Sequence, residues 1–159
     1  MWRPHRYCMP SLLLIIAVLL LRVQADGAPP ALNSPVGSWK TIDDKTGQAK
    51  AIVEVREANS EFEGRIVQLF NPPVPHPECV KCAGARKDQP VLGMQILWGM
   101  RQTGSEWTGG HVLDPETGNV YRCTFTLDNG GKELRIRGYV GFSVFGRTEK
   151  WVRVEYPKE

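Results

Sequence analysis

Short runs of β-branched and aromatic residues recur along the chain at nearly even spacing, and each run ends at a cluster of turn-forming residues. Runs of this kind, separated by Gly, Asn, Asp and Pro, are typical of antiparallel strands joined by short turns. No segment keeps the apolar stripe of an amphipathic helix, so the sequence indicates an all-β fold. We predict eight strands, over residues 36–42, 48–57, 61–70, 91–101, 106–113, 119–127, 132–140 and 147–155.

Eight strands that pair in chain order leave two exposed edges unless the sheet closes on itself. We therefore predict an eight-stranded antiparallel up-and-down barrel over residues 36–156, and a two-sheet sandwich is the alternative. Alternation assigns the two faces of each strand. The strand at residues 119–127 has one apolar face, which is expected to point into the barrel and consists of Tyr121, Cys123, Phe125 and Leu127.

The N-terminus has the three-part layout of a secretory signal peptide. Basic residues precede an apolar run at residues 12–21, and Val23 and Ala25 are small residues at the two positions that a signal peptidase reads. A membrane-spanning helix needs about twenty apolar residues, so this run is too short for a permanent anchor. We predict a signal peptide at residues 1–25, cleaved after Ala25, and a disordered, Pro-rich leader at residues 26–35.

Removal of the signal peptide changes the charge of the chain. The full sequence has 20 Lys and Arg against 17 Asp and Glu, and three of the arginines lie in the signal peptide. The mature chain, of about 134 residues, is therefore formally neutral and large enough for one domain with a hydrophobic core. Because no cluster of Lys and Arg remains to bind a phosphate backbone, nucleic acid is not an expected partner.

A Pro-rich insertion at residues 71–90 interrupts the strand pattern and carries two cysteines. In an exported protein, a disulfide between Cys79 and Cys82 is expected to clip this insertion, and a bond from one of them to Cys123 is the alternative. The spacing His76-x-x-Cys79-x-x-Cys82 also resembles that of zinc ligands. Oxidation competes with metal binding in such a compartment, so we predict neither a metal nor another cofactor.

The start of the first predicted strand, Gly37-Ser38-Trp39, resembles the Gly-x-Trp opening of the lipocalin and fatty-acid-binding superfamily. In that superfamily the Trp closes one end of the barrel, and an Arg from the last strand often lies over it. The resemblance implies a structural role for Trp39, with Arg153 or Arg147 as its partner.

A wider set of motifs resembles a bacterial exported family called domain of unknown function 2147. The resemblance covers nearly all of residues 36–154, and it implies a lipocalin-like barrel in the periplasm of a Gram-negative bacterium or outside its cell. It implies no established reaction. The motifs are Gly37-Ser38-Trp39-Lys40-Thr41, Cys79-Val80-Lys81-Cys82, Trp107-Thr108-Gly109-Gly110, Leu113-Asp114-Pro115-Glu116-Thr117-Gly118 with Tyr121, Arg137-Gly138-Tyr139-Val140-Gly141, and Gly146-Arg147-Thr148 with Trp151.

An apolar barrel interior with a few polar groups at its mouth is typical of a binding site for a small, partly apolar molecule. We therefore expect an exported, non-catalytic binding protein. The finer hypothesis is an anionic amphipathic ligand whose acid group is held by Arg137 and Arg147, although both could equally be surface charges. The residues expected to contact the body of the ligand are Trp107, Tyr121, Tyr139 and Phe142.

Two other functions remain open. A barrel that is packed solid would serve as a module that binds a protein or the cell envelope, with Phe142, Val144 and Phe145 of the loop at residues 141–146 on its contact surface. An unidentified enzyme is the third possibility. His111 lies three residues before Asp114, but no nucleophile motif accompanies this pair, so no catalytic residue is predicted.

Overall fold

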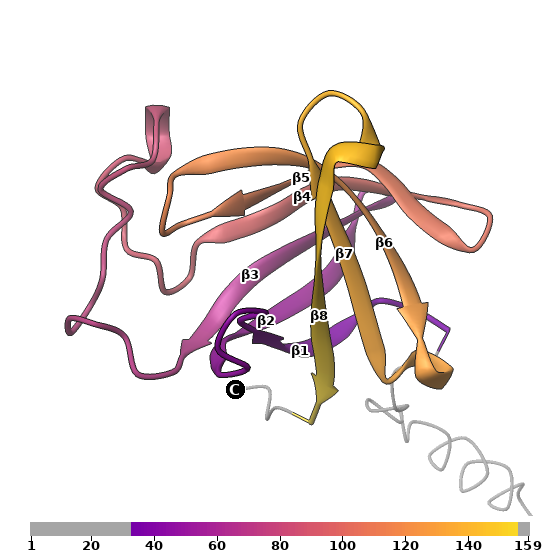
Figure 1. The fold of residues 1–159 in the computed structure, drawn as a ribbon, viewed down its shortest axis with the longest axis horizontal. Coiled ribbons are helices and arrows are strands. Elements are labelled where there is room, and N and C mark those ends of the chain that lie inside the picture. The colour runs from indigo at the N-terminus through magenta and orange to yellow at the C-terminus, as the bar shows by residue number, and fades with distance from the viewer. Residues whose placement is uncertain (1–32, 156–159) are drawn as a thin grey trace, which may run out of the picture.

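A computed structural model describes residues 33–155, which form one closed antiparallel barrel. Each strand pairs with its neighbours in the sequence, and β1 pairs with β8 to close the sheet (Figure 1). The prediction of an all-β, eight-stranded up-and-down barrel is confirmed. The strands are β1 Gly37–Ile42, β2 Ala49–Ala58, β3 Glu61–Leu69, β4 Gln95–Thr103, β5 Glu106–Asp114, β6 Asn119–Asp128, β7 Glu133–Tyr139 and β8 Gly146–Val154.

The predicted signal peptide, with its cleavage site after Ala25, lies outside the described residues, as does the predicted leader up to residue 32. Within residues 33–155, no helix is long and apolar enough to cross a membrane. Single 3₁₀ turns lie in the connections between strands, at Gly84–Arg86, Asn129–Gly131 and Ser143–Phe145.

Side-chain alternation sorts the apolar residues of the strands from the polar ones. Cys123 and Phe125 of β6 are buried, and so are Leu134 and Ile136 of β7, whereas Arg135 between the last two is exposed. Successive side chains of a strand point to opposite faces of the sheet. The apolar set therefore fills the barrel, and the polar set meets the solvent.

Trp39 closes one end of the barrel. Its side chain is fully buried, and its indole Nε1 donates a hydrogen bond to the carbonyl oxygen of Pro35 at 2.8 Å. The guanidinium of Arg153 lies 4.2 Å from the centroid of the Trp39 ring, within the range at which a cation and an aromatic face attract each other. Of the two arginines that the family resemblance offered, Arg153 takes this position.

Arg153 also joins three segments of the chain at the closed end. It donates hydrogen bonds to the carbonyl oxygens of Ser34 at 2.6 Å, Val36 at 2.8 Å and Gly131 at 2.7 Å. Burial lowers the pKa of Arg153, but a guanidinium remains charged at neutral pH. The leader predicted to be disordered through residue 35 therefore ends earlier, because the carbonyl groups of Ser34 and Pro35 are bound by this closing cluster.

Aromatic side chains fill the closed half of the interior. Trp107 stacks on Phe125 with ring centroids 5.2 Å apart, and Phe62 meets Trp107 at an interplanar angle of 84°. Among the described residues, Nε1 of Trp107 is the one buried side-chain nitrogen or oxygen without a hydrogen bond. Cys123 is also buried here and is not disulfide-bonded; its Sγ lies 3.3 Å from Sδ of Met100, and burial raises the pKa of its thiol to about 12.

Gly109 and Gly110 form a bulge in β5. The register between β5 and β6 shifts between Trp107 and Gly110. A Cβ added at Gly110 would lie 2.3 Å from Sδ of Met100 and 2.4 Å from the carbonyl oxygen of Trp98. A side chain does not fit in this space, so the glycine allows the close approach of β4 and β5.

Candidate functional site

The other end of the barrel opens into a cavity of about 1110 Å³. Its mouth is formed largely by three connections: the β1–β2 turn, the long segment between β3 and β4, and the β5–β6 turn. Figure 1 shows these connections at the same end of the barrel, towards the left of the view. The interior is thus neither wholly filled nor wholly open, because the core occupies the closed half and the cavity the open half.

The inner walls of the cavity are apolar. Strands β3, β4, β5 and β7 each contribute a β-branched aliphatic side chain, and β8 contributes an indole that is 2% exposed. Such a surface favours the apolar part of a ligand over water. The residues concerned are Ile66, Ile96, Val112, Ile136 and Trp151.

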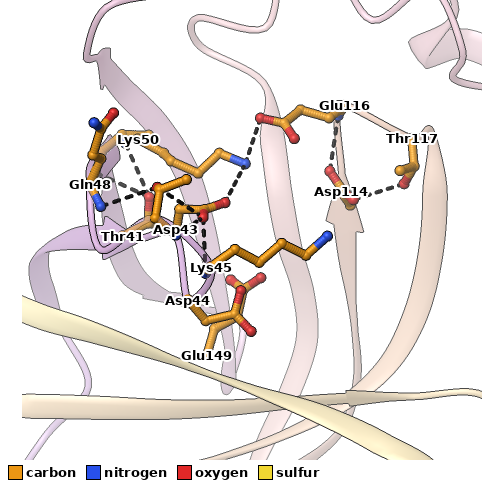
Figure 2. Close-up of polar contacts among 12 residues, drawn as sticks. Thr41, Asp43, Asp44, Lys45, Gln48, Lys50, Asp114, Glu116, Thr117 and Glu149 are labelled. Carbon is orange, nitrogen blue, oxygen red and sulfur yellow. Dashed lines mark hydrogen bonds and ion pairs between the residues drawn. The ribbon is translucent and has the colours of Figure 1, made fainter.

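One side of the mouth is polar, with Lys50 at its centre (Figure 2). The ammonium Nζ of Lys50 lies 2.5 Å from Oε1 of Glu116 and 3.7 Å from Oδ2 of Asp43. Because Lys50 belongs to β2 and Glu116 to the β5–β6 turn, this ion pair joins two sides of the mouth that no strand pairing connects. Burial alone would lower the pKa of Lys50, but its hydrogen bond to Glu116 and the charges of Glu116, Asp43 and Asp114 outweigh burial and raise that pKa.

Asp43 is held in place by the turn that it starts. Its carboxylate accepts hydrogen bonds from the backbone N–H of Thr46 at 2.8 Å, from the hydroxyl of Thr46 at 3.0 Å and from the backbone N–H of Lys45 at 3.0 Å. These bonds, chiefly those from Thr46, hold the pKa of Asp43 below its usual value. The turn ends at Gly47, whose φ of +70° suits a residue without a Cβ.

The β5–β6 turn has the same plan. Asp114 accepts hydrogen bonds from the backbone N–H of Glu116 at 2.9 Å and the hydroxyl of Thr117 at 2.8 Å. The turn ends at Gly118, with a φ of +74°, where an added Cβ would lie 2.1 Å from the carbonyl oxygen of Lys81. The turn that carries Glu116 therefore rests directly on the insertion.

The insertion between β3 and β4 forms one wall of the mouth, with Pro73, Val74 and Val80 among the lining residues. The predicted disulfide between Cys79 and Cys82 is confirmed, so neither thiol is available to Cys123 or to a metal. Within residues 33–155, no group of three or more His, Cys, Asp and Glu side chains is placed to hold a metal ion.

Three of the six residues predicted to contact a ligand line the cavity: Tyr121, Tyr139 and Arg147. Arg147 is engaged, because its guanidinium binds both carboxylate oxygens of Asp44, with Nε 2.8 Å from Oδ2. It therefore fixes the start of β8 to the β1–β2 turn.

The other three predicted contacts lie away from the cavity. Trp107 is enclosed in the closed half of the core, because the chain enters β5 at that end of the barrel. Phe142 is 79% exposed in the β7–β8 loop. Alternation places Trp107 on an inward face, and strand order places it at the Trp39 end, because the odd-numbered strands of an up-and-down barrel all start at that end. Phe142 lies in a loop, where alternation assigns no face.

Arg137 lies on the outward face of β7 and holds its own loop. Its guanidinium donates hydrogen bonds to the carbonyl oxygens of Ser143 at 2.7 Å and Val144 at 3.1 Å, and to the hydroxyl of Thr148 at 3.1 Å. With these contacts made, the side chain stays outside the barrel. Arg137 alternates with the buried Leu134 and Ile136, and β7 pairs with β6 and β8 without a register shift, so no bulge turns Arg137 inward.

His111 and Asp114 do not form the pair that a hydrolase would need. His111 stacks on Trp98 with ring centroids 5.7 Å apart, and Arg86 of the insertion lies 4.2 Å from the centroid of the Trp98 ring. The carboxylate of Asp114 is used within its own turn.

Several polar residues of the cavity were not predicted from the sequence, among them Asp43, Lys50, Glu116 and Glu149. The inward direction of Glu149 could have been predicted, because it lies two positions before Trp151 and so shares the inward face of β8. The contact between Lys50 and Glu116 has no local signal, since it depends on which turns meet when the barrel closes.

The sequence profile of a family described as “Uncharacterized protein conserved in bacteria (DUF2147)” matches residues 37–153. No curated protein matches the chain. Among solved structures, protein HP1028 from the human pathogen Helicobacter pylori, described as belonging to the lipocalin family, is similar, with a TM-score of 0.67 and 16% identity over 77% of this chain and 84% of that chain. At this identity the similarity concerns the fold, which is lipocalin-like.

Proposed function

The chain belongs to the bacterial family of uncharacterized proteins DUF2147, and from this premise we propose that it binds a small, partly apolar ligand in the cavity at the open end of the barrel. The observation that carries the proposal is the cavity of about 1110 Å³ with its apolar inner walls. Ligand pockets typically have volumes of about 300–1,000 Å³, apolar walls and a few polar groups. An eight-stranded barrel is also wide enough to hold one small ligand.

Binding without catalysis is part of the proposal. The described residues that line the cavity include neither Ser nor Cys, the commonest nucleophiles of covalent catalysis. The carboxylates of Asp43 and Asp114 are occupied by the backbone of their own turns. We place this binding in the periplasm or outside the cell, on the basis of the N-terminal signal pattern.

A neutral apolar fluorophore tests the proposal. N-phenyl-1-naphthylamine should bind the mature protein saturably, with one site per chain. Gly138→Leu should weaken this binding at least about tenfold, because a leucine would enter the cavity. A Cβ at Gly138 meets Tyr121 and Val112 at 3.5 and 3.6 Å, which are ordinary contacts, so the variant should fold. Thr124→Leu, on the outward face of β6, is the matched control and should bind like the native protein.

Absence of saturable binding by the native protein would reject the proposal. It would favour the second candidate, a module that binds a protein or the envelope. The β7–β8 loop supports that candidate, because Val140, Phe142 and Val144 are 71%, 79% and 77% exposed, and exposed apolar clusters mark interaction sites.

A further inference from the structure

Glu149 is a carboxylate on the inner wall of the cavity with almost no partner. It pairs in register with the buried Ile136 and lies two residues before Trp151, so it faces the interior. Among the described residues it makes no ion pair, and the one hydrogen bond that it accepts comes from Nε1 of Trp151 at 3.5 Å. That distance is at the limit for a hydrogen bond. Figure 2 accordingly draws no contact from Glu149 to Lys45 or Lys50.

The two cations that line the cavity, Lys50 and Arg147, are already bound. Lys50 lies between Glu116 and Asp43, and Arg147 is held by both oxygens of Asp44. An anionic ligand would have to break one of these pairs before it gained a cation of the cavity lining. A cationic ligand would leave both pairs intact.

The charges around the cavity are also unequal. Its lining residues include five carboxylates against Lys50 and Arg147, with His76 as a further titratable group. A cleft lined mainly by one sign of charge, with apolar walls, concentrates ligands of the opposite sign. The carboxylates are Asp43, Glu78, Asp114, Glu116 and Glu149.

We propose that the ligand is a cationic amphipath, whose ammonium or quaternary ammonium head pairs with Glu149 while its apolar part lies against the aliphatic walls. This inference rests on the proposed function and adds the sign of the ligand's charge to it. Trp151 and Tyr121 also line the cavity, and aromatic faces attract such cations. The inference reverses the anionic hypothesis, which depended on Arg137 and Arg147.

Three probes with the same chain test the sign of the charge: dodecylammonium, 1-dodecanol and dodecanoate, each titrated calorimetrically into the mature protein at neutral pH below its aggregation limit. Dodecylammonium should bind at least about tenfold more tightly than dodecanoate, with dodecanol between them. Glu149→Gln should lower the affinity for dodecylammonium about tenfold and change the affinity for dodecanol by less than about twofold, because only the charge is removed. Glu54→Gln removes the same charge from the outward face of β2 and should leave all three affinities unchanged.

The outcomes separate this inference from the function on which it rests. Failure of all three probes to bind would reject the proposed function. Binding of dodecanoate as tight as that of dodecylammonium, or equal affinities in native protein and Glu149→Gln, would overturn the cationic assignment and leave the binding function standing. Glu149→Lys provides an independent check, since it should make dodecanoate the preferred probe; an unchanged order of affinities would also overturn the assignment.

Discussion

At the scale of single residues, two of the three buried tryptophans among the described residues, Trp39 and Trp107, differ in one hydrogen bond. Nε1 of Trp39 binds the carbonyl oxygen of Pro35, whereas Nε1 of Trp107 has no partner among the described residues. A buried donor without a partner costs about 1–3 kcal/mol, so the indole of Trp107 carries a penalty that the indole of Trp39 avoids.

The same substitution should therefore have unequal effects at the two sites. Trp39→Phe should lower the free energy of unfolding by about 2–4 kcal/mol, because it strands the Pro35 carbonyl and weakens the packing of Arg153. Trp107→Phe should cost less than about 1 kcal/mol, because removal of the unpaired N–H offsets the lost ring area. Urea unfolding followed by far-ultraviolet circular dichroism measures both. Equal losses would show that the missing hydrogen bond of Trp107 has no energetic weight.

At the scale of elements, the β5–β6 turn and the insertion act as one unit. Gly118 lies so close to Lys81, beside the disulfide between Cys79 and Cys82, that an added Cβ would collide with the Lys81 carbonyl oxygen. The same turn carries Glu116, which reaches Lys50 across the mouth. The disulfide loop thus supports the turn, and the turn supports the polar side of the cavity.

Two matched glycines test this support. Gly47→Ala and Gly118→Ala place alanine at nearly the same φ, +70° and +74°, which costs about 1–2 kcal/mol for the left-handed conformation. A Cβ at Gly47 meets nothing within 4 Å, whereas one at Gly118 collides with Lys81. Gly118→Ala should therefore lower the free energy of unfolding by about 1–3 kcal/mol more than Gly47→Ala. Urea unfolding gives the comparison. Equal losses of unfolding free energy in the two variants would mean that the insertion does not pack against the turn.

The strands were predictable because each depends on local alternation and on its own turns. The largest difference in a boundary is at the start of β4, predicted at Val91 and found at Gln95. Val91 is apolar enough for a strand, but its N–H binds the carbonyl oxygen of Pro77, so this stretch closes the insertion instead. The site was less predictable from the sequence. Lys50 and Glu116 meet only when the barrel closes, and no local pattern shows that Arg137 binds the backbone of its own loop.

At the scale of the whole molecule, the sequence predicts that the barrel is released from an exported precursor. Protein recovered from the periplasmic or extracellular fraction should begin at Asp26, because Val23 and Ala25 flank the expected cleavage site. N-terminal sequencing or intact mass measures this. A chain that lacks residues 1–25 is the control and should stay in the cytoplasm. A membrane-bound chain that begins at Met1 would contradict the prediction.

The pairing of β1 with β8 determines when the barrel can close during folding. Ser38 pairs with Val154, and Trp39 with Arg153, so the closing pairs join the first and last strands of the barrel. Pairings so distant in sequence form late and slowly. A chain that threads a translocation channel N-terminus first cannot make them until its final strand has emerged. Late closure would keep such a precursor unfolded, and therefore able to pass through the channel, for the whole of its transit.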